Sequence, residues 1–265
     1  MHTREEKIEA LGRIIDTLDE LRIKCPWDRK QTNESLRPNT IEEVYELSDA
    51  LMNEDNINIK KELGDVLLHI LFYSKIGEEK GLFDITDVAD ALNAKLIFRH
   101  PHVFGEAKAD DAHQVELNWE QIKLKEKGGN KTVLSGVPNS LPPLIKSYRI
   151  QEKAANVGFD WDNPDDVWSK VKEETEEFEA EMRNGDAKSK QEEFGDLLFS
   201  IVNAGRKYGI HPDTALELTN KKFIRRFTEL ENRAKKAQKS LKDMSLEDMD
   251  AIWNEIKAEE HASRE

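Results

Sequence analysis

Four acidic side chains are spaced so that two helices could present them to one another. Glu43 and Glu46 stand three residues apart, and Glu62 and Asp65 repeat that spacing further along the chain. Residues three apart share one face of an α-helix. If the chain ends one helix, turns near residues 53–56 and returns antiparallel, the two pairs face each other. We therefore expect four carboxylates gathered in one place.

Carboxylates gathered in this way favour a bound divalent cation. Like charges at helical spacing cost about 0.2–0.5 kcal/mol per exposed pair, and more when they are buried. Ligands that are all oxygen suit Mg²⁺ or Mn²⁺. A di-iron site is disfavoured, because ferritin-like sites use a histidine three residues after a glutamate and none of the seven histidines has one. The alternative is an ordinary solvated helix face, which is what an isolated Glu-Glu-x-x-Glu usually is.

The acidic pattern occurs twice, and this favours the metal site over the solvated face. Glu42-Glu43-x-x-Glu46 returns 131 positions later as Glu173-Glu174-x-x-Glu177, and Glu62-x-Gly64-Asp65 returns as Glu193-x-Gly195-Asp196. The glycines are expected to permit a close approach beside the acids. The candidate metal ligands are Glu43, Glu46, Glu62 and Asp65 in the first copy and Glu174, Glu177, Glu193 and Asp196 in the second.

Basic and aromatic residues recur with the acids and suit phosphate binding. Lys and Arg four positions apart share a helix face and can hold a phosphate chain, and a tryptophan offers a stacking plane for a base. The alternative for each tryptophan is an aromatic residue of a core or an interface. The matched pairs are Lys95 and Arg99 with Lys222 and Arg226, and Trp119 and Lys123 with Trp253 and Lys257.

The elements that would position these residues are all helical. Apolar residues recur at helical spacing almost throughout, and sustained alternation is absent, so we predict an all-α fold. Thr40-x-x-Glu43 can form a capping box at a helix start, and Asn163-Pro164 is typical of an N-cap before a first-turn proline. Gly81 and Gly209 follow long helical stripes, as helix stops do. Glycines and prolines in residues 128–143 indicate a linker between domains spanning 1–127 and 144–265.

The composition limits location and partners. The net charge is −14, which disfavours nucleic acid as a partner. The single cysteine, Cys25, fits a reducing cytoplasm, and no apolar stretch approaches the roughly 20 residues of a membrane helix. The charged start of the chain is unlike a signal peptide. We therefore expect a cytoplasmic protein that binds neither nucleic acid nor membrane.

At these residues the sequence resembles the MazG family of nucleoside triphosphate pyrophosphohydrolases, within the all-α NTP pyrophosphatase superfamily. Both copies match the family motif, Glu-Glu-x-x-Glu, a spacer and Glu-x-x-Asp. The resemblance covers nearly the whole chain and includes Cys25-Pro26-Trp27-Asp28, residues 99–104 and residues 156–161. It implies two tandem helical-bundle domains, a homodimer, and hydrolysis of NTP, with dNTP as a further expected substrate, to NMP and pyrophosphate.

The resemblance also implies roles for residues of the second copy. It implies that the second-copy acids hold Mg²⁺. The first-copy acids are a further candidate site for the same metal. It implies nucleotide contacts from Lys222, Arg226, Trp253 and Lys257. A metal-bound water would attack the α-phosphorus, with metal and basic residues stabilising the leaving pyrophosphate. Glu173 is the candidate for orienting or deprotonating that water, although it could equally support a metal ligand.

Two other functions remain open at this point: a non-enzymatic helical scaffold, and a helical sensor that binds a nucleotide or metal without turnover. The matched carboxylates, basic residues and tryptophans argue against the scaffold but do not exclude the sensor. Within an enzyme, we expect the second copy to carry most of the activity. Lys221 and Arg225 add positive charge there, at positions matched by Ala94 and Phe98 in the first copy. Lys61 precedes the acids of the first copy, where a cation could weaken metal binding.

Overall fold

A computed structural model describes residues 1–105, 122 and 132–262 of the chain. In these ranges the regular elements are α-helices and short 3₁₀ turns, with no strand, which confirms the all-α prediction. The chain divides into two compact units, Met1–Ala109 and Asp110–Glu265. The predicted linker lies partly outside the described residues, so the predicted domain boundaries stay a prediction. No helix in the described ranges is both long and apolar enough to cross a bilayer.

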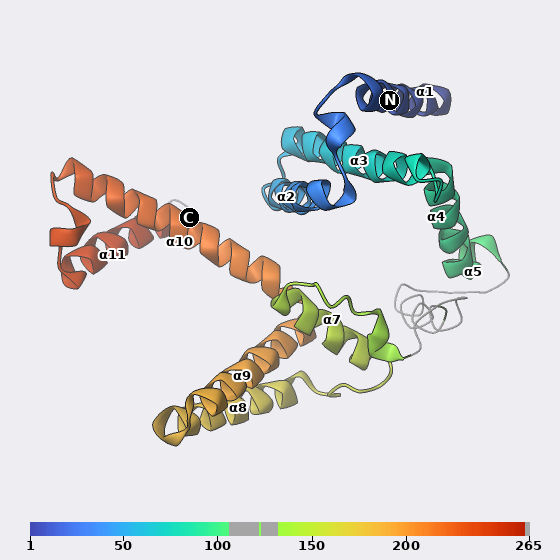
Figure 1. Cartoon of the computed structure of the whole chain (residues 1–265). Helices are drawn as coiled ribbons and strands as arrows, with labels where there is room; N and C mark the ends of the chain where they lie inside the picture. The colour runs from blue at the N-terminus through green and yellow to red at the C-terminus, as the bar shows by residue number, and fades with distance from the viewer. Residues whose placement is uncertain (106–121, 123–131, 263–265) are drawn as a thin grey trace. The chain divides into compact units, whose positions relative to one another are not determined.

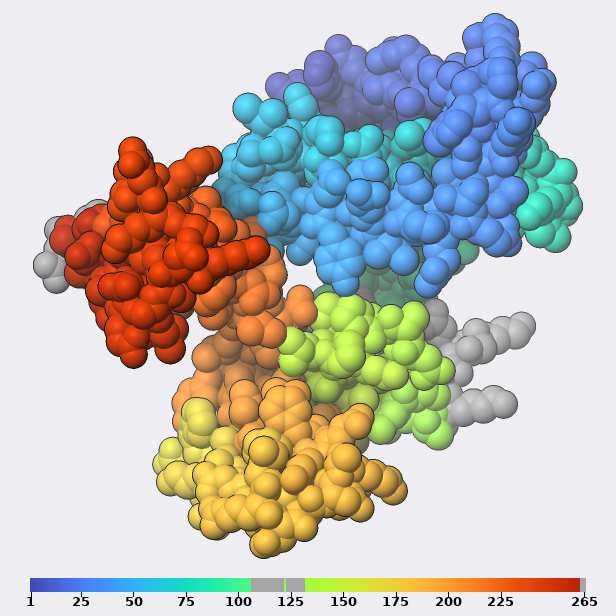
Figure 2. Space-filling model, turned by 60° about the vertical axis from the view of Figure 1, so that its left-hand side comes forward, coloured from blue at the N-terminus to red at the C-terminus, as the bar shows by residue number. Residues whose placement is uncertain are grey.

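The first unit is organised around one antiparallel helix pair. Its elements are α1 (Arg4–Lys24), η1 (Asp28–Lys30), α2 (Asn33–Met52), α3 (Asn56–Glu79), α4 (Ile85–Arg99) and α5 (Pro101–Phe104). The chain turns between α2 and α3 where the sequence predicts it, and the two helices run side by side (Figure 1). Helix α1 packs against α3, and α1–α3 form one continuous block (blue to cyan in Figure 2).

The start of α2 differs from the prediction. The helix begins eight residues before the expected capping box, with Thr32 as the N-cap in a reciprocal pair with Ser35. Thr40 lies inside the helix, and its hydroxyl contacts His69 Nδ1 at 3.0 Å and the Tyr73 hydroxyl at 2.6 Å on α3. A hydroxyl that bonds to side chains of the neighbouring helix is not available to cap the helix that carries it. The proposed Thr40–Glu43 capping box is therefore wrong.

The second unit repeats the helix pair and adds another. Its elements are η2 (Val133–Gly136), α7 (Pro143–Ala155), α8 (Pro164–Asn184), α9 (Ala187–Lys207), α10 (Pro212–Lys236), η3 (Leu241–Asp243) and α11 (Leu246–Ala262). Helices α8 and α9 pair, α10 pairs with α11, and α7 packs against α9 and α10 (Figure 1). Asn163 caps α8 before Pro164 as predicted, and Gly81 and Gly209 adopt the left-handed conformation after α3 and α9.

The first unit has a small apolar core, and an ion pair between a buried arginine and a partly exposed glutamate holds α1 on α3. Leu18 of α1 and Phe72 and Ile76 of α3 are buried together. Arg22, which is 8% exposed, pairs with both carboxylate oxygens of Glu79, at 2.8 and 2.5 Å, and donates to the carbonyl of Asp28. The ion pair lowers the pKa of Glu79. A carboxylate with a lowered pKa stabilises the fold above its unfolded pKa, and this contribution is lost as the pH falls through the folded pKa.

Replacing Glu79 with glutamine is expected to destabilise the protein by about 1–3 kcal/mol, because the buried guanidinium loses its charged partner. Urea unfolding at neutral pH measures the change, and the difference between variant and wild type should shrink in acid. Glu78→Gln is the matched control. Glu78 is 54% exposed in its pair with Lys75, so its loss should cost no more than about 0.5 kcal/mol. Equal losses for the two variants would contradict the structural role of the Arg22–Glu79 pair.

Candidate active site

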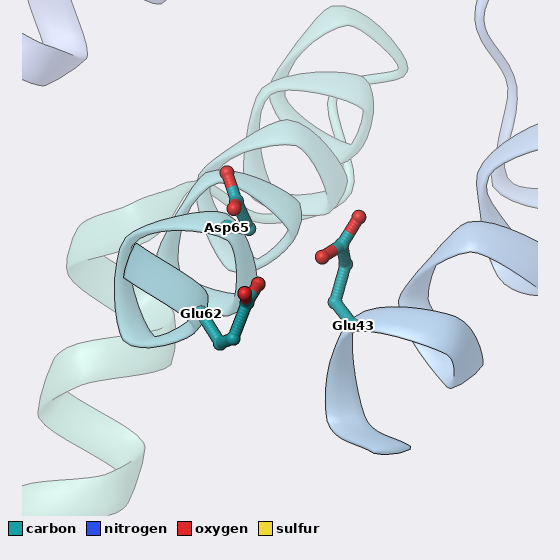
Figure 3. Close-up of side chains that lie close together, drawn as sticks. All are labelled: Glu43, Glu62 and Asp65. Atoms are coloured by element: carbon teal, nitrogen blue, oxygen red, sulfur yellow. The ribbon is translucent and has the colours of Figure 1, made fainter. Parts of the chain in front are cut away.

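The structure brings together three of the four predicted acids of the first copy. Glu43 projects from α2 toward Glu62 and Asp65 on α3 (Figure 3). One carboxylate oxygen of each lies within 4.8 Å of the others. We call these three residues the first acidic cluster. Glu62 is 4% exposed, and its Oε2 is buried without a hydrogen-bond partner. A buried carboxylate oxygen without a donor suits a cation.

Lys61 is a cation within reach of this cluster. Its Nζ lies 2.9 Å from Glu62 Oε1, 3.9 Å from Asp65 and 4.0 Å from Glu46. Glu46 thus borders the cluster through the lysine that it shares with Asp65. Burial and then the charges of Asp65, Glu46 and Glu62 raise the pKa of Glu43. The first copy therefore contains mutually repelling carboxylates and one lysine that neutralises part of their charge.

The second copy gathers its acids in the same way. Carboxylate oxygens of Glu174 and Glu177 on α8 and Glu193 on α9 lie within 4.8 Å of one another, and we call these residues the second acidic cluster. Burial and then the charges of Glu177 and Asp196 raise the pKa of Glu193. Asp196 is therefore near enough to act on the cluster electrostatically. Three of the four predicted acids again converge, but the second group contains Glu177 and not Asp196, whereas the first contains Asp65 and not Glu46.

The sequence reasoning missed Lys170, one helical turn before the acids of α8. Its Nζ lies 2.6 Å from Glu174 Oε1 and 2.8 Å from Glu173 Oε1, and these contacts raise the pKa of Lys170. Glu173, the candidate base, is thus held by Lys170 and lies outside the three-acid group; it is 56% exposed. The spacing Lys-x-x-Glu-Glu on a helix could have revealed the pair. In the described ranges, Lys170 pairs with acids of α8, whereas Lys61 reaches acids of both α2 and α3.

The expected role of the two motif glycines is wrong. A Cβ atom built on Gly64 or on Gly195 meets no other atom within 4 Å. Neither glycine is needed for close packing of its helix pair within the described residues. The acids approach one another because the side chains of paired helices converge.

The predicted nucleotide-binding residues of the second copy lie on the separate α10–α11 pair. Arg226 and Arg225 both pair with Glu260, each at 2.8 Å, and the guanidinium of Arg226 lies 5.8 Å from the centre of the Trp253 ring. Trp253 also contacts Phe223, at 5.2 Å between ring centres. Trp253 therefore packs within this helix pair, and Glu260 offsets part of the positive charge that the sequence predicted.

The remaining predicted contacts are distributed as follows. Lys222 lies exposed on α10 and Lys257 lies exposed on α11, each on the helix that carries its predicted partner. Lys95 and Arg99 of the first copy lie on α4. Trp119 and Lys123 lie outside the described residues.

An apolar pocket of about 340 Å³ adjoins the second acidic cluster. Glu174 and Asp196 line it, together with apolar side chains that include Phe159, Trp161 and Val167. The pocket was not expected from the sequence. The pocket lies next to acids that could hold a metal ion. With a cation bound there, the site suits a ligand that has one apolar end and one anionic end.

A comparison of the sequence with known protein families identifies the two segments that carry the acidic clusters. A model described as the MazG nucleotide pyrophosphohydrolase domain matches the chain twice, at residues 31–104 and 163–230. The chain belongs to the MazG family. The two MazG matches contain the two acidic clusters, and they confirm the predicted tandem repeat.

Individual MazG relatives resemble the chain over most of its length. A nucleoside triphosphate pyrophosphohydrolase/pyrophosphatase MazG of Thermotoga maritima is 43% identical over 92% of this chain and 94% of its own. A nucleoside triphosphate pyrophosphohydrolase of Escherichia coli K12 is 39% identical over 96% of this chain and 98% of its own. The likeness therefore extends over both helical units.

The donor set of the MazG clusters fits a divalent metal. All the converging atoms are carboxylate oxygens, as hard cations prefer. Burial and then the neighbouring carboxylates raise the pKa values of Glu43 and Glu193, and a bound cation would offset that repulsion. The acidic clusters can hold a metal ion.

Proposed function

We propose that this protein is a MazG nucleoside triphosphate pyrophosphohydrolase that converts NTP or dNTP and water to NMP and pyrophosphate. The observation that carries the proposal is the second acidic cluster, in a chain whose full-length relatives bear that name. The adjoining apolar pocket and the lysine and arginine side chains of the α10–α11 pair offer surfaces for the two ends of a nucleotide. Catalysis is assigned to the second copy.

Mg²⁺ is the proposed cofactor, with Mn²⁺ as a substitute. Glu174, Glu177, Glu193 and Asp196 would hold it, and the first-copy acids, Glu43, Glu46, Glu62 and Asp65, form a second candidate site. When bound, the metal supplies charge neutralisation at the phosphates and a water of lowered pKa. The convergence of the carboxylates from two helices supports this assignment.

The chain's own residues then act on the substrate and the water. Glu173 stands next to Glu174 at the edge of the cluster, where its carboxylate can accept a proton from a water attacking the α-phosphorus. Lys222, Arg226 and Lys257 are the proposed partners of the phosphate chain. Trp253 packs beside Arg226, so it contributes to the same surface. The leaving group is pyrophosphate, because attack at the α-phosphorus breaks the α–β anhydride bond.

A homodimer is the proposed assembly. Large apolar side chains are exposed on helices of the second unit, among them Phe194 (47%) on α9 and Phe223 (55%) and Ile224 (63%) on α10. A helix pair needs a further layer to bury such a face, and a second copy supplies one with matching chemistry. The single cysteine and the net charge of −14 support the remaining proposals: a cytoplasmic location, with neither nucleic acid nor membrane as partner.

Product analysis tests the function. Each NTP and dNTP is incubated with the protein, with Mg²⁺ or with a chelator, and the nucleotide and phosphate products are quantified. We expect NMP and pyrophosphate in equal amounts, and only in the reactions that contain Mg²⁺. NDP with orthophosphate would contradict cleavage at the α-phosphorus. Tight nucleotide binding without any product would favour the sensor, and neither binding nor product would favour the scaffold.

A further inference from the structure

Glu260 is an acidic residue on a helix face that also carries two of the proposed substrate contacts. Trp253, Lys257 and Glu260 follow one another on α11 at spacings of four and three, so they share one face of that helix. Helix α11 pairs with α10, which carries Lys222 and Arg226 (Figure 1). An acid in this set repels the phosphates that the other members are proposed to bind, and the proposed mechanism gives it no role.

The carboxylate of Glu260 binds two arginines of α10. Its Oε2 accepts from Nε of Arg226 at 2.9 Å and lies 2.8 Å from Nη2 of the same side chain. Its Oε1 accepts from Nε and Nη2 of Arg225, at 3.0 and 2.8 Å. Each carboxylate oxygen therefore binds one edge of one guanidinium. The hydrogen bonds from Arg226 and then from Arg225 lower the pKa of Glu260, so the carboxylate is charged at neutral pH.

Contacts on two sides fix the guanidinium of Arg226. Glu260 binds one edge, and the guanidinium carbon lies over the ring of Trp253, 5.8 Å from the ring centre. The side chains of Arg226 and Glu260 are 13% and 21% exposed, so this pair is screened less than a fully exposed one. The contacts to Glu260 use Nε and Nη2, and Nη1 provides further N–H donors. One arginine can therefore bind a carboxylate with one edge and a phosphate with another.

We propose that Glu260 is a positioning residue for the substrate: it holds the guanidinium of Arg226 in place to receive the phosphate chain. The inference rests on the proposed function, which assigns the phosphate chain to Arg226, and it adds a residue that touches neither phosphate nor metal. A flexible arginine loses side-chain freedom when it binds a ligand, and an arginine that a carboxylate already fixes has less freedom to lose. Glu260 thus strengthens substrate binding through order, although its charge alone would weaken it.

Glu260→Gln tests the proposal, because order and charge predict opposite results. The variant keeps the length of the side chain but loses the charge that binds both guanidinium groups. We expect the KM of the full-length protein for NTP, with Mg²⁺, to rise about five- to tenfold and kcat to change less than about threefold. KM does not depend on the folded fraction of the variant. A fall in KM would show that Glu260 only repels the phosphates, and it would overturn the proposal.

Glu259→Gln is the matched control. Glu259 is the neighbouring residue on α11 and pairs with Arg233 on α10 at 2.6 Å, so this variant loses the same charge and the same kind of contact between the two helices. Arg233 has no proposed contact with the substrate, so KM should change less than about twofold. An equal rise of KM in both variants would assign the effect to the packing of the helix pair and would contradict the proposal.

A double-mutant cycle shows whether Glu260 acts through Arg226. In an Arg226→Met background, which keeps an apolar stem beside Trp253, Glu260→Gln should no longer raise KM. The same rise in that background would overturn the proposal. Calorimetry of α,β-methylene ATP binding, with Mg²⁺, should show the same pattern in Kd without turnover. Absence of pyrophosphate release from every NTP by the wild type would defeat the proposed function, and the Kd values would still decide the role of Glu260.

Discussion

Glu177→Gln is expected to reduce turnover by at least about a hundredfold, whereas Glu46→Gln is expected to change it by less than about twofold. The two glutamates are matched by the repeat, so the pair of variants compares the same substitution in the two copies. Initial rates of pyrophosphate release from saturating NTP, measured in the full chain with Mg²⁺, provide the readout.

The structure supplies two reasons for the difference. Glu177 belongs to the second acidic cluster, while Glu46 borders the first and shares Lys61 with Asp65 at 4.0 and 3.9 Å. Lys170 also pairs with Glu174 in the second copy, but in the described residues it pairs only with acids of α8. Lys61 lies between acids of both helices and so competes with a metal across the whole site.

The cavities beside the acids also differ. The one beside the second-copy acids has largely apolar walls and is lined by Asn203, which the repeat matches to Phe72 in the core of the first unit. The one beside Glu46 and Glu62 is lined mainly by polar side chains.

The charge argument and the pocket argument can be told apart. Lys61→Gln removes the competing cation but leaves the first-copy core packed, so it should not transfer activity to the first copy. If Lys61→Gln made the Glu177→Gln variant active, the lysine would be the main reason for the difference. Equal losses in Glu177→Gln and Glu46→Gln, or a larger loss in the second, would contradict the assignment of catalysis to the second copy.

Removal of divalent metal is expected to abolish turnover, and readdition of Mg²⁺ to restore it. The metal should also stabilise the folded protein, because it binds the convergent acids of the native state and not the unfolded chain. Thermal unfolding with chelator and with Mg²⁺ measures this as a rise in Tm. In a Glu177→Gln, Glu46→Gln double variant the rise should shrink. Full activity in chelator would contradict the proposed cofactor.

The stabilisation by metal is expected to depend on pH with a defined sign. Burial and neighbouring carboxylates raise the pKa of Glu193, and burial and Asp65 raise that of Glu43. Carboxyls with raised pKa values favour the metal-free fold when they are protonated, and that contribution is lost as the pH rises through the folded pKa. Below the folded-state pKa, protons compete with the metal for the carboxylates. The rise in Tm on adding Mg²⁺ should therefore be large at about pH 7.5 and small at about pH 5. A rise that is independent of pH would contradict this competition.

The sequence determined the helical class, the repeat and the acids that could converge. These features follow from local rules, since residues three apart share a helix face whatever surrounds them. Asn163 and Pro164 start α8, and Gly209 ends α9, for reasons contained in a few neighbouring residues. Lys61 lies one position before Glu62, so its proximity to the acids could also be anticipated. The two family motifs added the chemistry that such acids perform.

The tertiary structure decided the features that depend on contacts distant in sequence. Thr40 has the residue type of a helix cap, but bonds to His69 and Tyr73 on the next helix hold it inside α2. The motif glycines meet open space, which no local rule could reveal. Gln151 was unremarked in the sequence because an isolated glutamine on a helix is usually solvated. Only the packing of α7 on α9 buries it, where its amide Nε2 donates to the carbonyl of Phe199, 48 residues further along the chain.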